Sequence, residues 1–202
     1  MSYANYSLQN TRLASEGLER FKEAGVDVVP NASILGMGLL RRGGVPVGGA
    51  GDWHPAPRAL RAAVGEASKW CDEKGEKIEV VAIRWAFESW MRVGNVLGSC
   101  GHRADGRNAL GGITVDKLGI SVIGVSTIAE LEETMRVWRS CLDGLDGAIE
   151  AGTTIDEHEA SIKRRANVQE LATGVMQSLG EYKDFDWGSP GEGFVREPVD
   201  EE

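Results

Sequence analysis

With 202 residues, 42% of them hydrophobic and 26% charged, the chain has the composition of a globular protein with room for one sizeable core. Its net charge of −9 and pI near 5.0 argue against a nucleic-acid or anionic-membrane partner, because both require a basic surface. No apolar run approaches the ~20 residues that cross a bilayer. The three cysteines are far apart and form no Cys-x-x-Cys motif, which disfavours a metal site and predicts a reducing, cytoplasmic location.

The first 29 residues predict two parallel strands joined by a helix. Residues 2–7 alternate small and aromatic side chains, as in a strand. Asn10 or Thr11 can cap a helix that runs to Ala24 and ends at Gly25, and the β-branched residues 26–29 follow as a second strand. Strand, helix and strand in this order form a βαβ unit.

Two packed helices are predicted after a glycine-rich loop at 36–53. Pro55 and Pro57 introduce the first helix, which ends at Gly75. Its apolar residues recur at helical spacing on one side: Leu60, Ala63, Val64, Ala67 and Cys71. The second helix covers residues 78–91 and is apolar on two sides, which predicts deep burial. Residues 94–119 are glycine-rich and without period, so we expect an irregular insertion there.

Residues 120–134 predict a short buried strand that turns into a capped helix. Thr127 and Glu130 have the spacing of a capping box. The helix is expected to bury its larger apolar residues, which are Ile128, Leu131, Met135, Trp138 and Leu142. Such a turn is either an ordinary connection or a site where backbone N–H groups meet a phosphate.

A charged helix at 154–180 is predicted to dock through its apolar residues, and an irregular tail from Glu181 follows, whose aromatic residues are expected to pack onto the body. The docking residues are Ile155, Ile162, Ala166, Leu171, Val175 and Leu179. His158 lies between acidic neighbours, so we expect it on a solvated face. Three parallel strands separated by helices predict an α/β sheet that is covered on both faces.

The segment from Asn31 to Leu40 follows the second strand directly. Ligands bind at the carboxyl ends of strands in α/β folds. Glycines at 36 and 38 allow the backbone to approach a ligand, and Ser33 adds a hydroxyl group. A glycine-rich turn with packing leucines explains the same residues equally well.

Together the two segments resemble the aldo-keto reductase family. The run Asn31-Ala-Ser-Ile-Leu-Gly-Met-Gly-Leu-Leu40 resembles that family's Ser-Pro-Leu-x-x-Gly-x-Leu turn after the seventh strand. The run from Val122 to Thr134 resembles its Ile-Pro-Gly-x-Ser-x-x-x-Gln-Leu-x-Glu-Asn segment, and residues 80–85 match its Val-Ala-Leu-Arg-Trp helix. Residues 52–55 and 187–194 are similar to D-arabinose- and L-galactose-type dehydrogenases within the family.

This resemblance implies an α/β fold that is part of a (β/α)8 TIM barrel, namely strands six to eight with their helices and a C-terminal helical tail. Residues 1–150 would form the barrel portion, and residues 151–202 would form the last helix and an irregular tail of the same domain. The implied activity is NAD(P)-dependent oxidation of an aldose at C1, such as D-arabinose. The family's catalytic Asp, Tyr, Lys and His lie on the first four strands, so we name no catalytic residue here.

The resemblance also implies where a nicotinamide dinucleotide binds. The pyrophosphate would lie against Ser33, Leu35, Gly36 and Gly38. The adenosine would lie against Gly124, Ser126, Glu130, Glu133 and Thr134. Glu130 and Gly124 stand where NADP-preferring relatives carry Arg and Lys, so NAD is expected over NADP.

Ile34 and Thr134 depart from the family's proline and asparagine, which would weaken contacts to the cofactor. The alternative is a non-catalytic remnant or an interaction module that keeps only part of a dinucleotide site.

Overall fold

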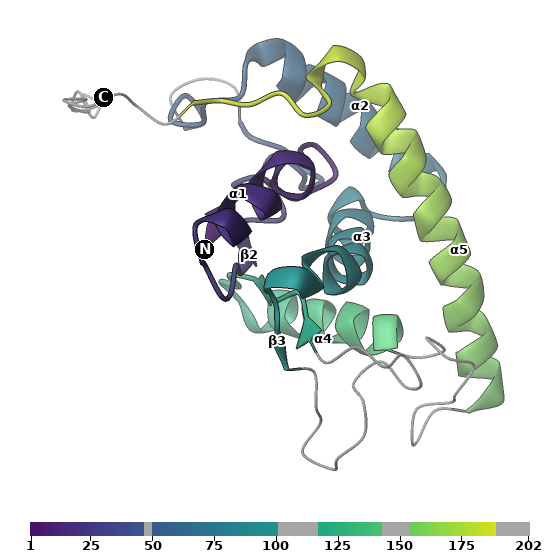
Figure 1. The fold of residues 1–202 in the computed structure, drawn as a ribbon. Helices are drawn as coiled ribbons and strands as arrows, with labels where there is room; N and C mark the ends of the chain where they lie inside the picture. The colour runs from purple at the N-terminus through teal and green to yellow at the C-terminus, as the bar shows by residue number, and fades with distance from the viewer. Residues whose placement is uncertain (47–49, 101–116, 143–153, 189–202) are drawn as a thin grey trace.

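The computed structural model describes residues 1–46, 50–100, 117–142 and 154–188, and the statements below concern these residues. A small parallel sheet lies beside a layer of helices, with α3 at the centre and the long helix α5 along one flank (Figure 1). The strands are β1 (Ser2–Tyr3), β2 (Asn31–Ala32), β3 (Ser99–Cys100), β4 (Lys117–Leu118) and β5 (Ser121–Val122). The α-helices are α1 (Leu18–Glu23), α2 (Arg58–Glu73), α3 (Ile78–Val93), α4 (Ile128–Leu142) and α5 (Ile155–Ser178).

The three strands β1, β2 and β5 form one sheet in that order, and both pairs are parallel. The prediction of three parallel strands is therefore confirmed. The second strand was placed wrongly, since it begins at Asn31 and residues 26–29 are not a strand. The Val29 N–H donates to the Leu97 carbonyl, and Pro30 has no N–H to pair with a neighbouring strand.

The segment expected to be an irregular insertion contains regular structure at both ends. A 3₁₀ turn at Gly94–Leu97 leads into β3, which pairs antiparallel with β4. The prediction was therefore wrong for these residues. Residues 101–116 lie outside the described part of the chain.

The first helix begins later than predicted and starts as a wide turn. Leu13–Gly17 is a π-helical turn, and α1 follows directly. Asn10 still helps to start it, because its Oδ1 accepts a hydrogen bond from the Arg12 N–H at 2.9 Å. The helix ends at Glu23, and Gly25 follows its C-cap in the left-handed conformation, as expected of the predicted stop.

Helices α2 and α3 have the buried faces that the sequence predicts. In α2, Leu60, Val64, Ala67 and Cys71 are buried, while Ala63 is partly exposed. Helix α3 packs on two sides: Val81 and Ala82 join the core shared with α2 and α5, whereas Val80, Ile83 and Phe87 join a second core with α4. Both described free cysteines, Cys71 and Cys141, are buried core residues, and burial raises their pKa values to about 11 and 12.

Helix α5 docks through only part of the predicted set. Leu171, Val175 and Leu179 are buried, but Ile155, Ile162 and Ala166 in the first half of the helix are exposed, so the prediction was wrong for these three. The capping box Thr154–Glu157 starts this helix. His158 is buried, so the expectation of a solvated face was wrong.

The aromatic tail packs onto the body, as expected. Tyr182, Phe185 and Trp187 lie against the core of α2, α3 and α5. The Gln9 side-chain amide holds this tail by donating to the Tyr182 and Phe185 carbonyls at 3.0 and 2.9 Å.

Helix α4 turns the predicted apolar face outward. Ile128 is 77% exposed, and Leu131 and Met135 are also exposed, whereas Val137 and Cys141 are buried against α3. Trp138 is partly buried in the same cluster. The prediction was therefore wrong for these three residues, because α3 meets the other side of the helix, and the Leu142 side chain lies outside the described part of the chain.

The observed architecture is α/β with mostly helices and a small parallel sheet. No helix in the described ranges combines the length and the hydropathy that crossing a membrane requires.

Candidate functional site

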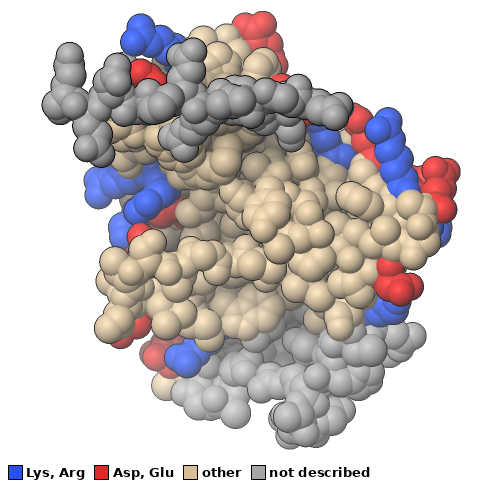
Figure 2. Space-filling view, turned by 90° about the vertical axis from the view of Figure 1, so that its left-hand side faces the viewer, with Lys and Arg blue, Asp and Glu red and all other residues tan. Residues whose placement is uncertain are grey.

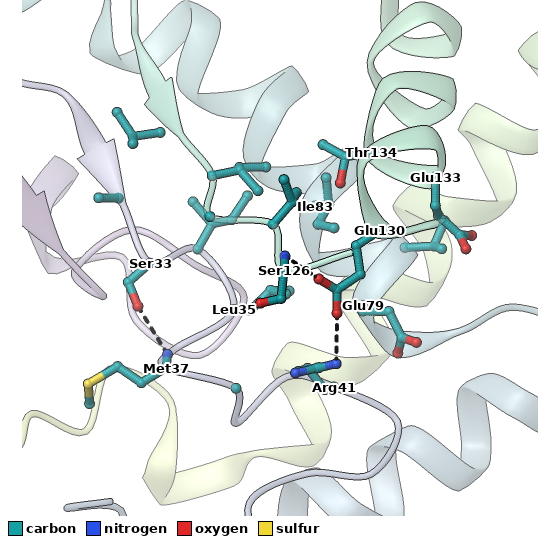
Figure 3. A pocket seen from close by; sticks show the side chains of 18 of the residues that line it. Ser33, Leu35, Met37, Arg41, Glu79, Ile83, Ser126, Glu130, Glu133 and Thr134 are labelled. Carbon is teal, nitrogen blue, oxygen red and sulfur yellow. Dashed lines mark hydrogen bonds and ion pairs between the residues drawn. The ribbon is translucent and has the colours of Figure 1, made fainter. Parts of the chain in front are cut away.

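A cavity of about 790 Å³ lies where the chain leaves β2 and β5. The two strands are adjacent and parallel, so their carboxyl ends meet at one edge of the sheet. The turn after β2, the turn after β5 and the first residues of α3 and α4 surround the cavity (Figure 3). The lining residues are Tyr3, Ala32, Ser33, Ile34, Leu35, Met37, Gly38, Arg41, Glu79, Val80, Ile83, Val122, Ile123, Gly124, Val125, Ser126, Ala129, Glu130, Glu133 and Thr134.

The turn after β2 is held in an unusual backbone conformation. Four of its residues have positive φ: Ser33 (57°), Gly36 (57°), Met37 (56°) and Gly38 (94°). Ser33 and Met37 are strained there, because side chains other than glycine disfavour this region. The Ser33 hydroxyl accepts a hydrogen bond from the Met37 N–H at 3.0 Å, which closes the turn (Figure 3). Strained turns of this kind concentrate at binding sites.

His54 fixes this turn from behind. Its Nδ1 accepts a hydrogen bond from the Ala56 N–H at 3.0 Å, so its Nε2 carries the proton and donates to the Gly36 carbonyl at 2.9 Å. The ring is buried and lies edge-on to Trp53 and Trp187. Burial lowers the pKa of His54, and the charge of Arg61 lowers it further against the opposing effect of the Gly36 carbonyl.

Glu130 anchors the turn after β5 with both of its carboxylate oxygens. One accepts from the Ser126 N–H at 2.7 Å, and the other pairs with the Arg41 guanidinium at 3.1 Å (Figure 3). The Glu130 N–H donates to the Thr127 hydroxyl at 3.2 Å. The predicted capping box is thus half formed, since the Glu130 side chain binds the N–H of Ser126. Two N–H groups that could have faced a phosphate are already paired with side chains.

Three carboxylates and one guanidinium line the cavity, and each has a partner of opposite charge or a backbone donor. Glu133 pairs with Lys77 at 3.2 Å, and Glu79 accepts from the Arg42 N–H at 2.9 Å. The remaining walls are largely apolar. Carboxylates in such a cavity accept hydrogen bonds from hydroxyl groups and oppose a phosphate.

Eight of the nine residues predicted to contact a cofactor line this one cavity, and Gly36 is the exception. Gly36 instead contributes its carbonyl to His54, which shapes the turn. Sequence reasoning missed Arg41, Glu79 and Met37, which also line the cavity. Met37 belongs to the Asn31–Leu40 segment already singled out and Arg41 follows it directly, so their position in the chain was an available signal. Glu79 lies in the first turn of α3, and no signal in the sequence marked it as a cavity residue.

The cavity suits part of a dinucleotide on structural grounds. Its volume lies within the range of about 300–1,000 Å³ found for small-molecule and cofactor sites. Apolar residues such as Ile123 and Ile83 can flank a flat ring, and Glu130 and Glu133 can accept hydrogen bonds from ribose. A Cβ added at Gly124 would meet nothing within 4 Å, so the wall is open there. Among the described residues, no group of three or more His, Cys, Asp and Glu has a metal-binding arrangement.

Comparison with known proteins gives the same family as the sequence motifs. The model of the aldo/keto reductase family matches residues 1–146. D-arabinose 1-dehydrogenase of Saccharomyces cerevisiae is 33% identical over 97 residues, which cover 48% of this chain and 28% of that protein. L-galactose dehydrogenase of Arabidopsis thaliana is 36% identical over 87 residues, which cover 43% of this chain and 25% of that protein. Each match spans less than a third of the relative's length.

Proposed function

The chain belongs to the aldo/keto reductase family, and we propose that its cavity beside β2 and β5 binds the nicotinamide dinucleotide of an NAD(P)-dependent oxidoreductase. One observation carries this proposal. Two segments about 90 residues apart in the chain, chosen from their motifs, contribute eight of nine predicted residues to a single cavity. The bound nicotinamide would accept or donate hydride.

We assign the two ends of the dinucleotide from the two turns. The strained turn around Ser33, Leu35, Gly36 and Gly38 would hold the pyrophosphate end. Gly38 leaves backbone accessible there, and φ of +94° reserves the position for glycine. The start of α4, with Gly124, Ser126, Glu130, Glu133 and Thr134, would hold the adenosine. The carboxylates at this end favour ribose hydroxyl groups as ligands.

NAD is the proposed cofactor, with NADP bound more weakly. A Glu130 carboxylate can accept a hydrogen bond from the ribose 2′-hydroxyl and repels a 2′-phosphate. Glu133 and Glu79 add negative charge to the same cavity.

The proposed substrate is an aldose oxidised at C1, such as D-arabinose. The printed activities of the two relatives support this class. The residues that resemble the family begin at its sixth strand, so we propose that these 202 residues bind dinucleotide but do not oxidise sugar by themselves. A cytoplasmic location is proposed from the unpaired, buried Cys71 and Cys141.

Titration calorimetry of the 202-residue chain with NAD and with NADP tests the proposal. We expect NAD to bind with the lower dissociation constant. Gly124→Trp should abolish binding, because the new ring enters the cavity from a position where a side chain meets nothing. The matched control is Gly43→Trp, which is equally open but does not line the cavity. Tighter NADP binding would contradict the cofactor preference, and equal binding by both variants would contradict the site.

A second candidate is a non-catalytic interaction module. The side of the molecule where the N-terminus lies has a centre of uncharged side chains, with its charged residues around the edge (Figure 2). Met1, Tyr3 and Trp53 are more than half exposed, and so is Ile128 on α4. Contiguous exposed apolar surface is typical of interfaces. This candidate predicts a stable complex in light scattering and no binding of NAD in calorimetry.

A further inference from the structure

Arg41 is the cationic side chain that faces the cavity among its described lining residues. It follows the strained turn after β2, and its Nη2 lies 3.1 Å from the Glu130 carboxylate at the start of α4. The pair therefore joins the two segments assigned to the cofactor, as the dashed line between them shows (Figure 3). Arg41 touches the same carboxylate that would meet the ribose 2′-hydroxyl.

The other cations near the cavity have different partners. The Lys77 ammonium pairs with Glu133, and the Arg42 guanidinium pairs with Asp72 at 3.0 Å. Among the described cations, Arg41 both lines the cavity and contacts Glu130.

We propose that Arg41 is a second determinant of cofactor preference, acting against Glu130. Its guanidinium neutralises the Glu130 carboxylate and offers a cation to the 2′-phosphate of a phosphorylated adenosine. This inference rests on the proposed function of the cavity. The preference for NAD is then the balance of two adjacent charges, and Glu130 alone does not set it.

Because the Arg41–Glu130 pair is exposed, Arg41 can exchange Glu130 for another anion with little loss of free energy. The side chains of Arg41 and Glu130 are 58% and 37% exposed, and ion pairs at such positions contribute little to stability. A phosphate monoester carries more negative charge than one carboxylate and can accept two guanidinium hydrogen bonds. Arg41 can therefore leave Glu130 for a 2′-phosphate at small cost.

The test uses adenosine 5′-monophosphate and adenosine 2′,5′-bisphosphate, which differ only in the 2′-phosphate. Their dissociation constants are measured for the 202-residue chain by titration calorimetry, or by displacement of NAD where binding is weak. Arg41→Ala should weaken the bisphosphate about tenfold, the scale of one charge-assisted hydrogen bond, and change the monophosphate less than about twofold. Glu130→Gln should strengthen the bisphosphate about tenfold, and adding Arg41→Ala to that variant should remove the gain.

Arg42→Ala is the matched control, since it removes a neighbouring exposed arginine that pairs with Asp72 away from Glu130. It should leave both dissociation constants unchanged, and circular dichroism of every variant reports on folding.

If Arg41→Ala has no effect on the bisphosphate in either background, the inference is wrong while the cavity assignment stands. If it weakens both nucleotides equally, Arg41 contacts the 5′-phosphate and the inference is wrong in its assignment. Binding of neither nucleotide nor NAD by the wild-type chain contradicts the proposed function itself, and the inference with it.

Discussion

Helices α2, α3 and α5 bury their apolar residues in a common core, whereas α4 exposes most of its own. Leu60 in α2 and Val175 in α5 are fully buried, but Ile128 and Leu131 in α4 face outward. The side of α4 that meets the body carries Glu130, Glu133 and Thr134 at the cavity, and only its last turns bury apolar residues. One region is stabilised by hydrophobic burial, and the other arranges charges and strained backbone around a cavity.

This difference between the core and the cavity predicts that substitutions in the two regions change different properties. Substitutions in the helical core should lower the free energy of unfolding and leave the affinity of the folded protein for nucleotides unchanged. Substitutions around the cavity should change the affinity for nucleotides and cost less stability than substitutions in the core. Functional sites commonly sacrifice stability in this way.

The largest expected effect comes from the residue that joins the two regions. Arg84 in α3 is 1% exposed and donates to the Ser140 hydroxyl and carbonyl in α4 at 2.6 and 3.0 Å. It also pairs with Glu88, which in turn pairs with Arg165 of α5. Arg84→Met should cost about 3–5 kcal/mol in urea unfolding, because Glu88 keeps its charge and loses a buried partner.

Hydrogen exchange provides the second measurement on the Arg84 variant. Amide protection should fall in α4 more than in α2, since the lost bonds connect α4 to the body. A loss below about 1 kcal/mol would mean that Arg165 alone holds Glu88 and α4 in place.

A matched pair of leucines tests the contrast between buried and exposed apolar residues. Leu60→Ala removes a fully buried side chain and should cost about 2–5 kcal/mol. Leu131→Ala removes a side chain that is 47% exposed, so we expect a cost under about 1 kcal/mol. Chemical denaturation of both variants measures this. Equal costs would show that the outer face of α4 is covered in solution, and sedimentation velocity would then detect the association.

The sequence predicted the elements that local pattern controls. The three parallel strands, helix α2 and the two buried sides of α3 follow from hydrophobic period and from glycine and proline positions. The segments that carry the family motifs contain most of the residues that line the cavity.

The predictions from sequence fail where residues far apart in the chain determine the structure. Helix α4 carries two stripes with apolar residues, and period alone cannot tell whether Leu131 or Val137 meets the body. The Arg41–Glu130 pair spans 89 positions, and His54 binds a backbone carbonyl, which leaves no mark on the pattern of side chains. Val26–Val29 has the composition of a strand, but Pro30 has no N–H to donate to a ladder, and the strand begins at Asn31.

The strained turn after β2 predicts an effect on nucleotide binding with a moderate loss of stability. Gly38→Ala introduces a Cβ at φ of +94°, which should cost about 1–2 kcal/mol or shift the turn. The affinity for NAD, measured by calorimetry, should fall with it. Gly43→Ala is the control in the same loop, because Gly43 has no positive φ and no neighbour within 4 Å of an added Cβ. Unchanged affinity in Gly38→Ala would remove this turn from the site.

The smallest expected effect is a pH dependence of stability and of NAD affinity. It comes from His54, which holds the turn after β2 from its buried side. The pKa of His54 is lowered below its ordinary value of 6.5, chiefly by burial, so the folded protein favours the neutral ring. The unfolded chain therefore binds more protons than the folded chain between these two pKa values. Stability is fully present above pH 6.5 and declines as the pH falls from 6.5 through the folded pKa.

Protonation at Nδ1 would also place a ring N–H donor against the Ala56 N–H donor. The ring would then hold the Gly36 carbonyl less firmly. NMR titration of the His54 ring should give a midpoint below 6.5, with NAD affinity falling over the same range. His54→Gln should be less stable at neutral pH and should lose this component of the pH dependence. A midpoint at or above 6.5 would mean that the ring is solvated and does not fix the turn, and the cavity would then owe its shape to the Ser33–Met37 hydrogen bond alone.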